Sequence, residues 1–508
     1  MKSTFYITTP IYYPNDVPHL GHAYTTIAAD ILSRWNKLQG KEVFFLTGTD
    51  EHGKKLAKVA EKTGKTPKEF TDHLVPEFKK AWKQLNISYD RFIRTTDKDH
   101  EKVVQEILQK VYDAGDIYKG VYEGLYCTDC EAYYTEKDAP DSICPIHKRP
   151  LENLKEESYF FKLSEYQNYL LDLYKKNPEF ISPSHRKAEI VNRVKEGLKD
   201  FSISRTSFNW GIPLPFDKKH ICYVWFDALL NYLSGVSYLK DKKQFKKFWP
   251  ADAHIIGKDI IWFHTVYWPA MLKSAGIEPP KKVFAHGFWT VKSEKMGKSA
   301  GNAIKIAQLI SYAGIDSARY FLIRSTPFGE DGDFDEKAVI DRHNNELANK
   351  LGNLISRVST LAEKYGLEKI SAPPARSART NNSRTSPAIT ARNEEDYANP
   401  LSIEKTKKAV EKHMQNFELD KALNEIFAFI DLCNTYIQDK KPWQTQDKKV
   451  LYQLANAIKD FTILLSPFLP ETSEKIAKTF NFSINYKNLN KPLAIRPIKK
   501  SEVLFKKI

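Results

Sequence analysis

The sequence predicts an α/β protein in which a parallel-sheet domain is split by an insertion and followed by an all-α helical bundle. The first observation is that short apolar runs alternate with helical periodicity in residues 4–46 and again in residues 222–286, as in the strand, helix, strand units of parallel sheets. The second is that apolar residues recur with helical spacing from Glu336 onward. A length of 508 residues agrees with several domains, because single hydrophobic cores usually stop growing by about 250 to 300 residues.

The first half of the sheet domain begins with a strand over residues 4–12 that contains Pro10. The helix predicted for residues 21–38 has an apolar face made by Ile27, Ile31, Leu32, Trp35 and Leu38. Gly40 marks the end of that helix, since glycine is favoured just after a helix C-terminus. The apolar run Val43–Leu46 then predicts a second, buried strand.

The same alternation returns after a cysteine-containing segment, with strands predicted at 253–257 and 283–286 and a helix around 263–275. In the bundle, one apolar face is made by Leu347, Leu351, Leu354, Ile355, Val358 and Leu361. Further helices are predicted near residues 401–418, 420–438 and 447–468. We expect domain segments at 1–114, 115–220, 221–335 and 336–508, with 371–400 as a flexible insertion whose polar composition cannot bury a core.

Charge and composition narrow the class of protein. The 78 Lys and Arg exceed the 63 Asp and Glu, and the formal net charge of +15 favours a polyanionic partner such as nucleic acid. No apolar run reaches the roughly 18 residues of a membrane span, and residues 1–9 lack the features of a signal peptide. We therefore expect a cytoplasmic protein without a membrane partner.

Four potential metal ligands fall in one short segment: Cys127, Cys130, Cys144 and His147. Each pair encloses two residues, a spacing that lets two side chains wrap one tetrahedral ion, and thiolates with one imidazole suit Zn²⁺. Four protein ligands leave no open coordination position, so the segment predicts one structural zinc. The competing interpretation is three buried cysteines near an unrelated histidine.

Two motifs carry the expected phosphate chemistry. His19-Leu20-Gly21-His22 lies where the first strand meets the first helix, and a helix N-terminus attracts phosphate. Lys295-Met296-Gly297-Lys298-Ser299 lies in a loop between a predicted strand and the helical stretch 304–313, where two lysines can neutralise a polyphosphate. Alone, each motif is also compatible with surface histidines or a solvated basic loop.

Together the two motifs resemble the HIGH and KMSKS signatures of class I aminoacyl-tRNA synthetases, and further segments resemble the methionyl-tRNA synthetase family over essentially the whole chain. These segments are Pro10–Asp16, Thr47–Gly53, Trp225–Ala228, Gly257–Ile260 with Phe263-His264, and Lys441–Trp443. The resemblance implies a Rossmann-type catalytic domain, a zinc-binding connective insertion of the single-knuckle form, and a helical-bundle anticodon-binding domain. It implies a ligase that joins methionine to tRNA(Met), including the initiator, with ATP and Mg²⁺.

The resemblance also implies roles for individual residues. Catalysis is expected from His19, His22, Lys295 and Lys298, and ATP binding from these four with Gly21, Asp259 and Ser299. Arg205 is placed to reach the adenylate. The amino acid is expected to bind Ile11, Tyr13, Asp50, Trp225, Ala228, Tyr232, Ile260 and His264, with Asp50 on the ammonium group. Gly297 replaces the middle serine of the signature and is expected to alter how the loop closes.

In the bundle, the residues expected to contact the anticodon are Asn353, Arg357, Pro442 and Trp443. Without the resemblance, Asn353 and Arg357 would read as a solvated face and Trp443 as a core residue. The chain ends at Ile508 soon after the bundle, so we expect no appended dimerising domain and a monomer.

Three alternatives stay open from the sequence. A synthetase for cysteine or a branched amino acid shares both phosphate motifs but lacks this set of pocket segments or carries a large editing insertion. A small nucleotidyltransferase would leave the zinc knuckle and the bundle unexplained. A catalytically inactive RNA-binding paralogue would need none of His19, His22, Asp50, Lys295 and Lys298 together.

Overall fold

The structure is a computed structural model that describes residues 3–128, 132–134, 139, 141–145, 148–296, 301–369 and 400–508. It forms two compact units. The first, here the sheet unit, contains Met1–Ser311 and Phe328–Asp335. The second, the helical unit, contains Tyr312–Pro327 and Glu336–Ile508. The expected flexible insertion 371–400 lies almost wholly outside the described residues, and so do Gly297, Lys298 and Ser299 of the KMGKS loop.

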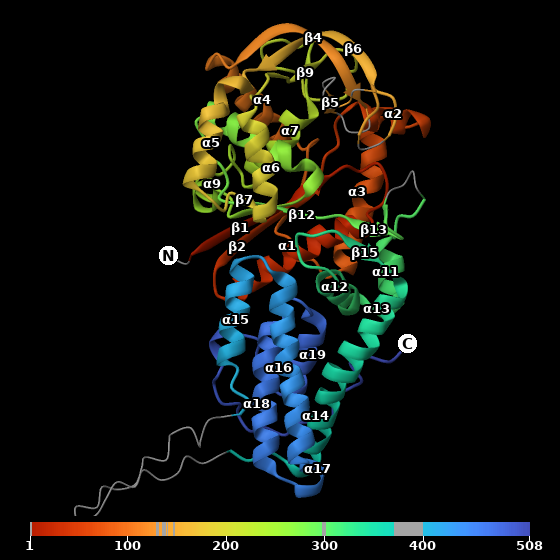
Figure 1. The fold of residues 1–508 in the computed structure, drawn as a ribbon, viewed down its shortest axis with the longest axis vertical. Helices are drawn as coiled ribbons and strands as arrows, with labels where there is room; N and C mark the ends of the chain where they lie inside the picture. The colour runs from red at the N-terminus through yellow and green to blue at the C-terminus, as the bar shows by residue number, and fades with distance from the viewer. Residues whose placement is uncertain are drawn as a thin grey trace, which may run out of the picture. The chain divides into compact units, whose positions relative to one another are not determined.

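A six-stranded parallel sheet forms the centre of the sheet unit (Figure 1). Its spatial order is β3 (Arg91–Arg94), β2 (Glu42–Thr49), β1 (Thr4–Tyr12), β11 (Ala253–Gly257), β12 (Val283–His286) and β7 (Ile181–Ser182). Strand β1 pairs with β2 on one side and with β11 on the other, and both pairings are parallel. The order of strands therefore runs outward in opposite directions from the β1–β11 pair. Ligands of open α/β sheets bind at the carboxyl ends of the strands at such a point.

The predicted strands of both halves are confirmed, because β1, β2, β11 and β12 cover the expected residues. Helix α1 (Leu20–Leu38) is also confirmed, one residue longer at its start. The predicted helix at 263–275 begins instead as a π-helix, Phe263–Tyr267, and continues as α10 (Trp268–Ser274). Further helices of this unit are α2 (Lys54–Lys62), α3 (Pro67–Gln84), α4 (Lys98–Asp113), α7 (Val224–Leu229), α8 (Asn231–Gly235), α9 (Lys242–Phe248) and α11 (Ile306–Ala313).

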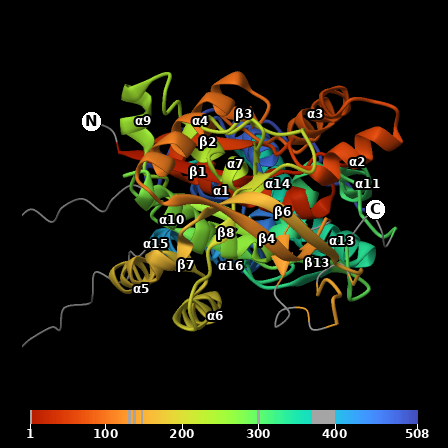
Figure 2. The ribbon, with the colours of Figure 1, turned by 90° about the horizontal axis from the view of Figure 1, so that it is seen from above.

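The segment 115–220 forms its own antiparallel sheet, in the order β5 (Ala132–Tyr134), β4 (Ile117–Cys127), β6 (Glu152–Phe161) and β8 (Phe201–Ser202). Figure 2 shows β4 and β6 as two long neighbouring strands. Helices α5 (Gln167–Lys176) and α6 (Ser184–Lys195) follow β6. Strand β7 lies between these helices and pairs with β12, so part of this segment completes the central sheet.

Two small sheets complete the unit. Strands β9 (Ser204–Arg205) and β10 (Ile221–Cys222) pair antiparallel. The other small sheet is made of β14 (Glu294–Lys295), β13 (Trp289–Val291) and β15 (Gly332–Phe334). This second sheet contains the beginning of the KMGKS loop, because β14 ends at Lys295.

The helical unit consists of helices packed along their apolar faces, and α16 and α18 run side by side (Figure 1). Its helices are α12 (Ile315–Arg324), α13 (Glu336–Arg342), a π-helix (His343–Gly352), α14 (Asn353–Tyr365), α15 (Glu404–Gln415), α16 (Leu419–Lys440), α17 (Pro442–Thr445), α18 (Lys448–Leu465) and α19 (Pro470–Thr479). The predicted apolar face is buried from Leu347 to Val358, whereas Leu361 is only half-buried. Among the described residues, none of the helices is long and apolar enough to cross a membrane.

Candidate active site

A cavity of about 740 Å³ opens at the carboxyl ends of β1, β11 and β12. It is lined by all eight residues that the sequence assigned to the amino acid: Ile11, Tyr13, Asp50, Trp225, Ala228, Tyr232, Ile260 and His264. His19, Gly21, His22 and Asp259 line the same cavity. Segments more than 200 residues apart in the sequence thus meet around one space, within the sheet unit.

The HLGH motif forms the N-terminus of α1. The His19 ring nitrogen Nδ1 accepts from the Gly21 backbone N–H at 3.1 Å, and His22 Nδ1 accepts from the His19 backbone N–H at 3.2 Å. The centroids of the His19 and His22 rings lie 3.9 Å apart. Because each Nδ1 is an acceptor, each neutral ring carries its proton on Nε2. A Cβ atom added at Gly21 would meet the His19 ring at 3.0 Å, so a side chain here would disturb the cap.

Burial keeps both imidazoles neutral at pH 7. It lowers the pKa of His19 to about 4, and it lowers the pKa of His22 well below its ordinary value with a further contribution from His19. Desolvation disfavours the charged form of an imidazole, which explains the direction of both shifts. The motif therefore offers polyphosphate a helix N-terminus and neutral N–H donors.

The apolar part of the cavity is aromatic. The Trp225 and Phe263 rings stack with centroids 3.8 Å apart and planes 4° from parallel. Tyr232 Oη lies 2.7 Å from His264 Nε2, and His264 Nδ1 lies 3.0 Å from the Ile260 carbonyl. The carbonyl can only accept, so Nδ1 donates to it and Tyr232 donates to Nε2. Burial lowers the pKa of His264 to about 4, which agrees with this neutral tautomer.

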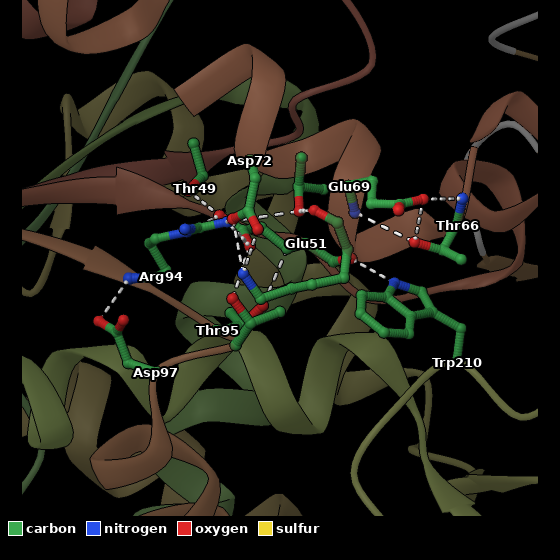
Figure 3. Close-up of polar contacts among 12 residues, drawn as sticks. Thr49, Glu51, Thr66, Glu69, Asp72, Arg94, Thr95, Asp97 and Trp210 are labelled. Atoms are coloured by element: carbon green, nitrogen blue, oxygen red, sulfur yellow. Dashed lines mark hydrogen bonds and ion pairs between the residues drawn. The ribbon is translucent and has the colours of Figure 1, made fainter. Parts of the chain in front are cut away.

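Three consecutive residues after β2 have different surroundings. Asp50 lines the cavity, while Glu51 belongs to the network of polar contacts drawn in Figure 3. The Glu51 carboxylate accepts from Arg94 Nε at 2.6 Å and Arg94 Nη2 at 2.8 Å, from Thr49 at 2.6 Å and from Thr96 at 2.7 Å. The Trp210 indole N–H donates to the Glu51 carbonyl at 2.6 Å.

His52, the third of these residues, reaches a different partner. Its Nδ1 lies 2.7 Å from Asp227 Oδ2, and His100 Nε2 lies 2.7 Å from Asp227 Oδ1. Asp227 and both imidazoles are buried. Burial alone would raise the pKa of the Asp227 carboxyl, but the two imidazoles hold this pKa below its ordinary value. Asp227 is thus a buried carboxylate that binds two rings from distant parts of the chain.

The expected ATP residues are described only in part. Asp259 is exposed at the cavity, and the Gly257 backbone approaches it closely, because a Cβ there would meet Asp259 Oδ1 at 2.7 Å. Arg205 is buried, and its guanidinium lies over the Tyr223 ring at 4.5 Å. Lys295 ends β14, and its neighbour Met296 lines the cavity. Lys298 and Ser299 lie outside the described residues.

Two of the four expected zinc ligands, Cys127 and Cys144, are described, and both are buried. Cys127 ends β4, and the Cys144 carbonyl accepts from the Lys148 backbone N–H at 2.8 Å. Two buried thiols of this kind fit zinc, which binds thiolates. Cys130 and His147 lie outside the described residues, within which no group of three or more metal-ligating side chains gathers.

The expected anticodon residues lie in the helical unit. The Arg357 guanidinium lies 4.9 Å from the Trp443 ring centroid. Asn353 is exposed, Arg357 and Trp443 are half-buried, and Pro442 is buried at the first position of α17. The structure therefore brings Arg357 together with Trp443, whose indole keeps some exposed surface.

The cavity also contains residues that the sequence interpretation did not select. One is His286, which ends β12 and whose Nε2 lies 2.7 Å from Thr25 Oγ1. Its position could have been found, because a polar residue at the carboxyl end of a parallel strand faces the ligand cleft. Others are Asn231, Trp262 and Phe288, for which no sequence signal pointed to the cavity.

Comparisons with known proteins agree with this geometry. The family model described as "tRNA synthetases class I (M)" matches residues 5–150 and 137–359, and the model of the anticodon-binding domain of tRNA ligases matches residues 402–503. The methionine–tRNA ligase of Caldanaerobacter subterraneus subsp. tengcongensis is 46% identical over 485 residues, which are 94% of this chain and 74% of that protein. The methionine–tRNA ligase of Thermotoga maritima is 43% identical over 491 residues, covering 94% and 75% of the two chains.

A solved structure extends the similarity to the whole fold. Mycobacterium tuberculosis methionyl-tRNA synthetase in complex with methionyl-adenylate matches with a TM-score of 0.92 at 36% identity. The match covers 99% of this chain and 100% of that one. Family models, relatives and structure agree on one assignment, and they confirm the predicted parallel-sheet catalytic domain and helical anticodon-binding domain. The chain therefore belongs to the methionyl-tRNA synthetases, a family of class I aminoacyl-tRNA ligases.

Proposed function

We propose that this chain activates L-methionine with ATP and transfers the methionyl group to the terminal adenosine of tRNA(Met), including the initiator. The observation that carries the proposal is the single cavity that His19, His22, Asp50, Tyr232 and His264 line together. An inactive RNA-binding paralogue is not favoured, because such a module needs no cavity of this composition.

For ATP, the proposal assigns the phosphates to the N-terminus of α1. Neutral His19 and His22 would donate from Nε2, and the helix N-terminus would favour the negative charge. Lys295 and Lys298 would stabilise the departing pyrophosphate, with Ser299 beside them, and Asp259 and Gly21 would contact the nucleoside. The family uses ATP with Mg²⁺, which neutralises phosphate charge.

For methionine, the proposal assigns the ammonium group to Asp50 and the thioether to the aromatic part of the cavity. Ile11, Tyr13, Trp225, Ala228 and Ile260 supply apolar surface. Tyr232 and His264 are the polar groups there, with proton positions fixed by the Ile260 carbonyl. A flexible, polarizable side chain such as that of methionine packs well on aromatic rings.

For tRNA, the proposal assigns the anticodon to Asn353, Arg357, Pro442 and Trp443. An unpaired base can stack on a partly exposed indole, and an arginine beside it can bind the base or its phosphate. We also propose that the protein acts in the cytoplasm as a monomer.

For the metal, we propose that Cys127, Cys130, Cys144 and His147 hold one zinc ion. The ion would crosslink the tip of the β4–β6 region and would have no open position for chemistry. The donor set of thiolates and one imidazole supports zinc rather than a harder cation. Metal analysis of the purified protein, compared with a Cys144→Ser variant, tests this assignment.

The experiment that tests the function is amino-acid-dependent exchange of labelled pyrophosphate into ATP, run with each of the twenty amino acids. We expect exchange with methionine, and loss of exchange in a Lys298→Ala variant. Lys305→Ala, a change of another lysine beyond the loop, is the matched control and should retain exchange. Exchange with a different amino acid would overturn the assignment of the amino-acid pocket.

A further inference from the structure

The loop that follows β2 is held from both sides of its backbone. Asp50 lines the cavity, whereas the next two residues, Glu51 and His52, do not line it and bind different partners. Glu51 binds Arg94 with two hydrogen bonds, and Arg94 also pairs with Asp72 at 2.6 Å (Figure 3). His52 binds Asp227. The orientation of the Asp50 side chain is therefore set by the contacts of the two residues that follow it. We call these contacts anchors: Glu51 with Arg94, and His52 with Asp227.

The Asp227 anchor connects this loop to the opposite wall of the cavity. Asp227 lies on α7, and four other residues of this short helix line the cavity: Val224, Trp225, Ala228 and Leu229. The peptide of His52 binds a residue of the cavity wall, since Tyr13 Oη donates to the His52 carbonyl at 2.8 Å. One buried carboxylate thus holds α7 and the Asp50–His52 loop at a fixed separation.

The second imidazole, that of His100, holds the Asp227 carboxylate in place. His100 on α4 contacts Asp227 Oδ1 through Nε2 and the Ser234 hydroxyl through Nδ1, at 2.7 and 2.8 Å. Both oxygens of Asp227 are engaged, so the carboxylate cannot rotate without breaking one of these contacts. A buried charge is costly unless it is paired and hydrogen-bonded, and here the pairing joins α4, α7 and the loop after β2.

We propose that Asp227, acting through His52, is a positioning residue that sets the geometry of Asp50 for the ammonium group of the amino-acid substrate. The inference rests on the proposed function, because it takes Asp50 as the ammonium ligand. Loss of the contact between His52 and Asp227 moves the Asp50 carboxylate relative to α7. Misplacement of a binding group by about 1 Å can cost about 100-fold in rate. Because Asp50 is assigned to the amino acid and not to ATP, we expect weaker use of methionine and unchanged use of ATP.

The test is pyrophosphate exchange with separate KM values for methionine and ATP, measured on Asp227→Asn and on two variants of His52. His52→Ala removes the contact, whereas His52→Asn keeps an N–H close to the position of Nδ1. We expect the KM for methionine to rise about tenfold or more in Asp227→Asn and His52→Ala, with partial rescue in His52→Asn and little change in the KM for ATP. The His52 pair carries the test if Asp227→Asn does not fold.

Two inhibitors identify which contact is lost. Methioninol keeps the ammonium group, whereas 4-(methylthio)butan-1-ol has the same carbon chain and lacks it. We expect the anchor variants to bind methioninol more weakly and the alcohol as before. In an Asp50→Asn background, Asp227→Asn should weaken methioninol binding little further, because two residues that act as a unit are not additive.

A matched control is Asp316→Asn, since Asp316 is another buried aspartate but lies in the helical unit. It should leave both KM values unchanged. The inference is overturned if the anchor variants lower the melting temperature with an unaltered KM for methionine, or raise the two KM values equally. Absence of methionine-dependent exchange in the unaltered protein would instead overturn the proposed function itself.

Discussion

Buried charged side chains are used differently in the two units of the molecule. In the sheet unit, Asp227 and Glu51 bind other side chains, and each is the chain neighbour of a residue that lines the cavity, Ala228 and Asp50. In the helical unit, two buried charges, Asp316 and Arg319, bind backbone groups near helix ends. Asp316 accepts from the Thr472 N–H in the first turn of α19 at 2.7 Å, and Arg319 donates to the carbonyls of Pro467 and Phe468 just after α18.

This difference in partners indicates that the buried charges have different roles in the two units. The backbone groups at helix ends have no partner within the helix, so the buried charges of the helical unit stabilise its fold. The side-chain pairs of the sheet unit hold segments at defined distances and so shape a site. Substitutions in the sheet unit should therefore change kinetics, whereas substitutions at the helix ends should change stability.

The largest effect is expected for His19. His19→Asn keeps an acceptor for the Gly21 N–H, because asparagine is among the best N-cap residues, but it removes the ring that lines the cavity. Exchange of pyrophosphate into ATP should fall about 100-fold or more, as when one electrostatic donor is removed from an active site. The melting temperature should stay within about 2 °C, since an asparagine cap costs little. An unchanged exchange rate would contradict the assignment of His19 to phosphate.

The next effect is expected in the helical unit, at Trp443, whose indole is partly exposed. Trp443→Ala should weaken tRNA binding by about 1 to 3 kcal/mol, the range for loss of one stacked base. Aminoacylation at limiting tRNA measures this loss, and Trp443→Phe should retain part of the binding because it keeps a ring. Equal tRNA binding by the alanine variant and the unaltered protein would remove Trp443 from the anticodon site.

Acid should destabilise the sheet unit through its buried imidazoles. Burial lowers the pKa of His19, His264 and His286 to about 4, while these groups titrate near 6.5 in an unfolded chain. Between these values the unfolded state binds more protons, so stability is present above about pH 6.5 and is lost as the pH falls toward 4. The melting temperature should drop by several degrees between pH 7 and pH 5, about 2 to 4 °C for each kcal/mol in a domain of this size.

His286→Gln provides the control for the acid effect, because glutamine keeps a polar group near the position of Nε2 and does not titrate. The pH dependence of its melting temperature should be shallower than that of the unaltered protein. A slope equal to that of the unaltered protein would exclude His286 as a contributor.

The smallest effect is expected for Asp316→Ala. Removing the acceptor leaves the Thr472 N–H buried without its present partner, which should lower the free energy of unfolding by about 1 to 3 kcal/mol. Chemical denaturation measures this loss, and methionine-dependent exchange should be unchanged. A large fall in exchange without a change in stability would contradict the separation of tasks between the two units.

The sequence predicted strands that are apolar runs and missed strands that are not. Strands β1, β11 and β12 are apolar runs with clear ends, so their positions could be predicted from pattern alone. Strand β3 contains two arginines, and β7 has two residues, so neither shows the alternation that identifies a strand. Their pairing with β2 and β12 comes from the tertiary structure.

The candidate site shows the same limit. The eight residues expected to bind the amino acid line one cavity, and motifs selected them because each motif has a recognisable order of residue types. The Asp227 contacts could not be predicted in this way. His52 and His100 lie 175 and 127 residues before Asp227, and only the folded chain brings both rings to one carboxylate.

The most direct measurement of the whole account is to incubate the protein with ATP, all twenty amino acids and unfractionated tRNA, and to identify the aminoacyl-tRNA by mass spectrometry. The account predicts methionine attached to tRNA(Met), the initiator included. A different amino acid would contradict the assignment of the sheet-unit cavity. Methionine attached to other tRNAs would contradict the role of the helical unit, and absence of any aminoacyl-tRNA with folded protein would contradict both.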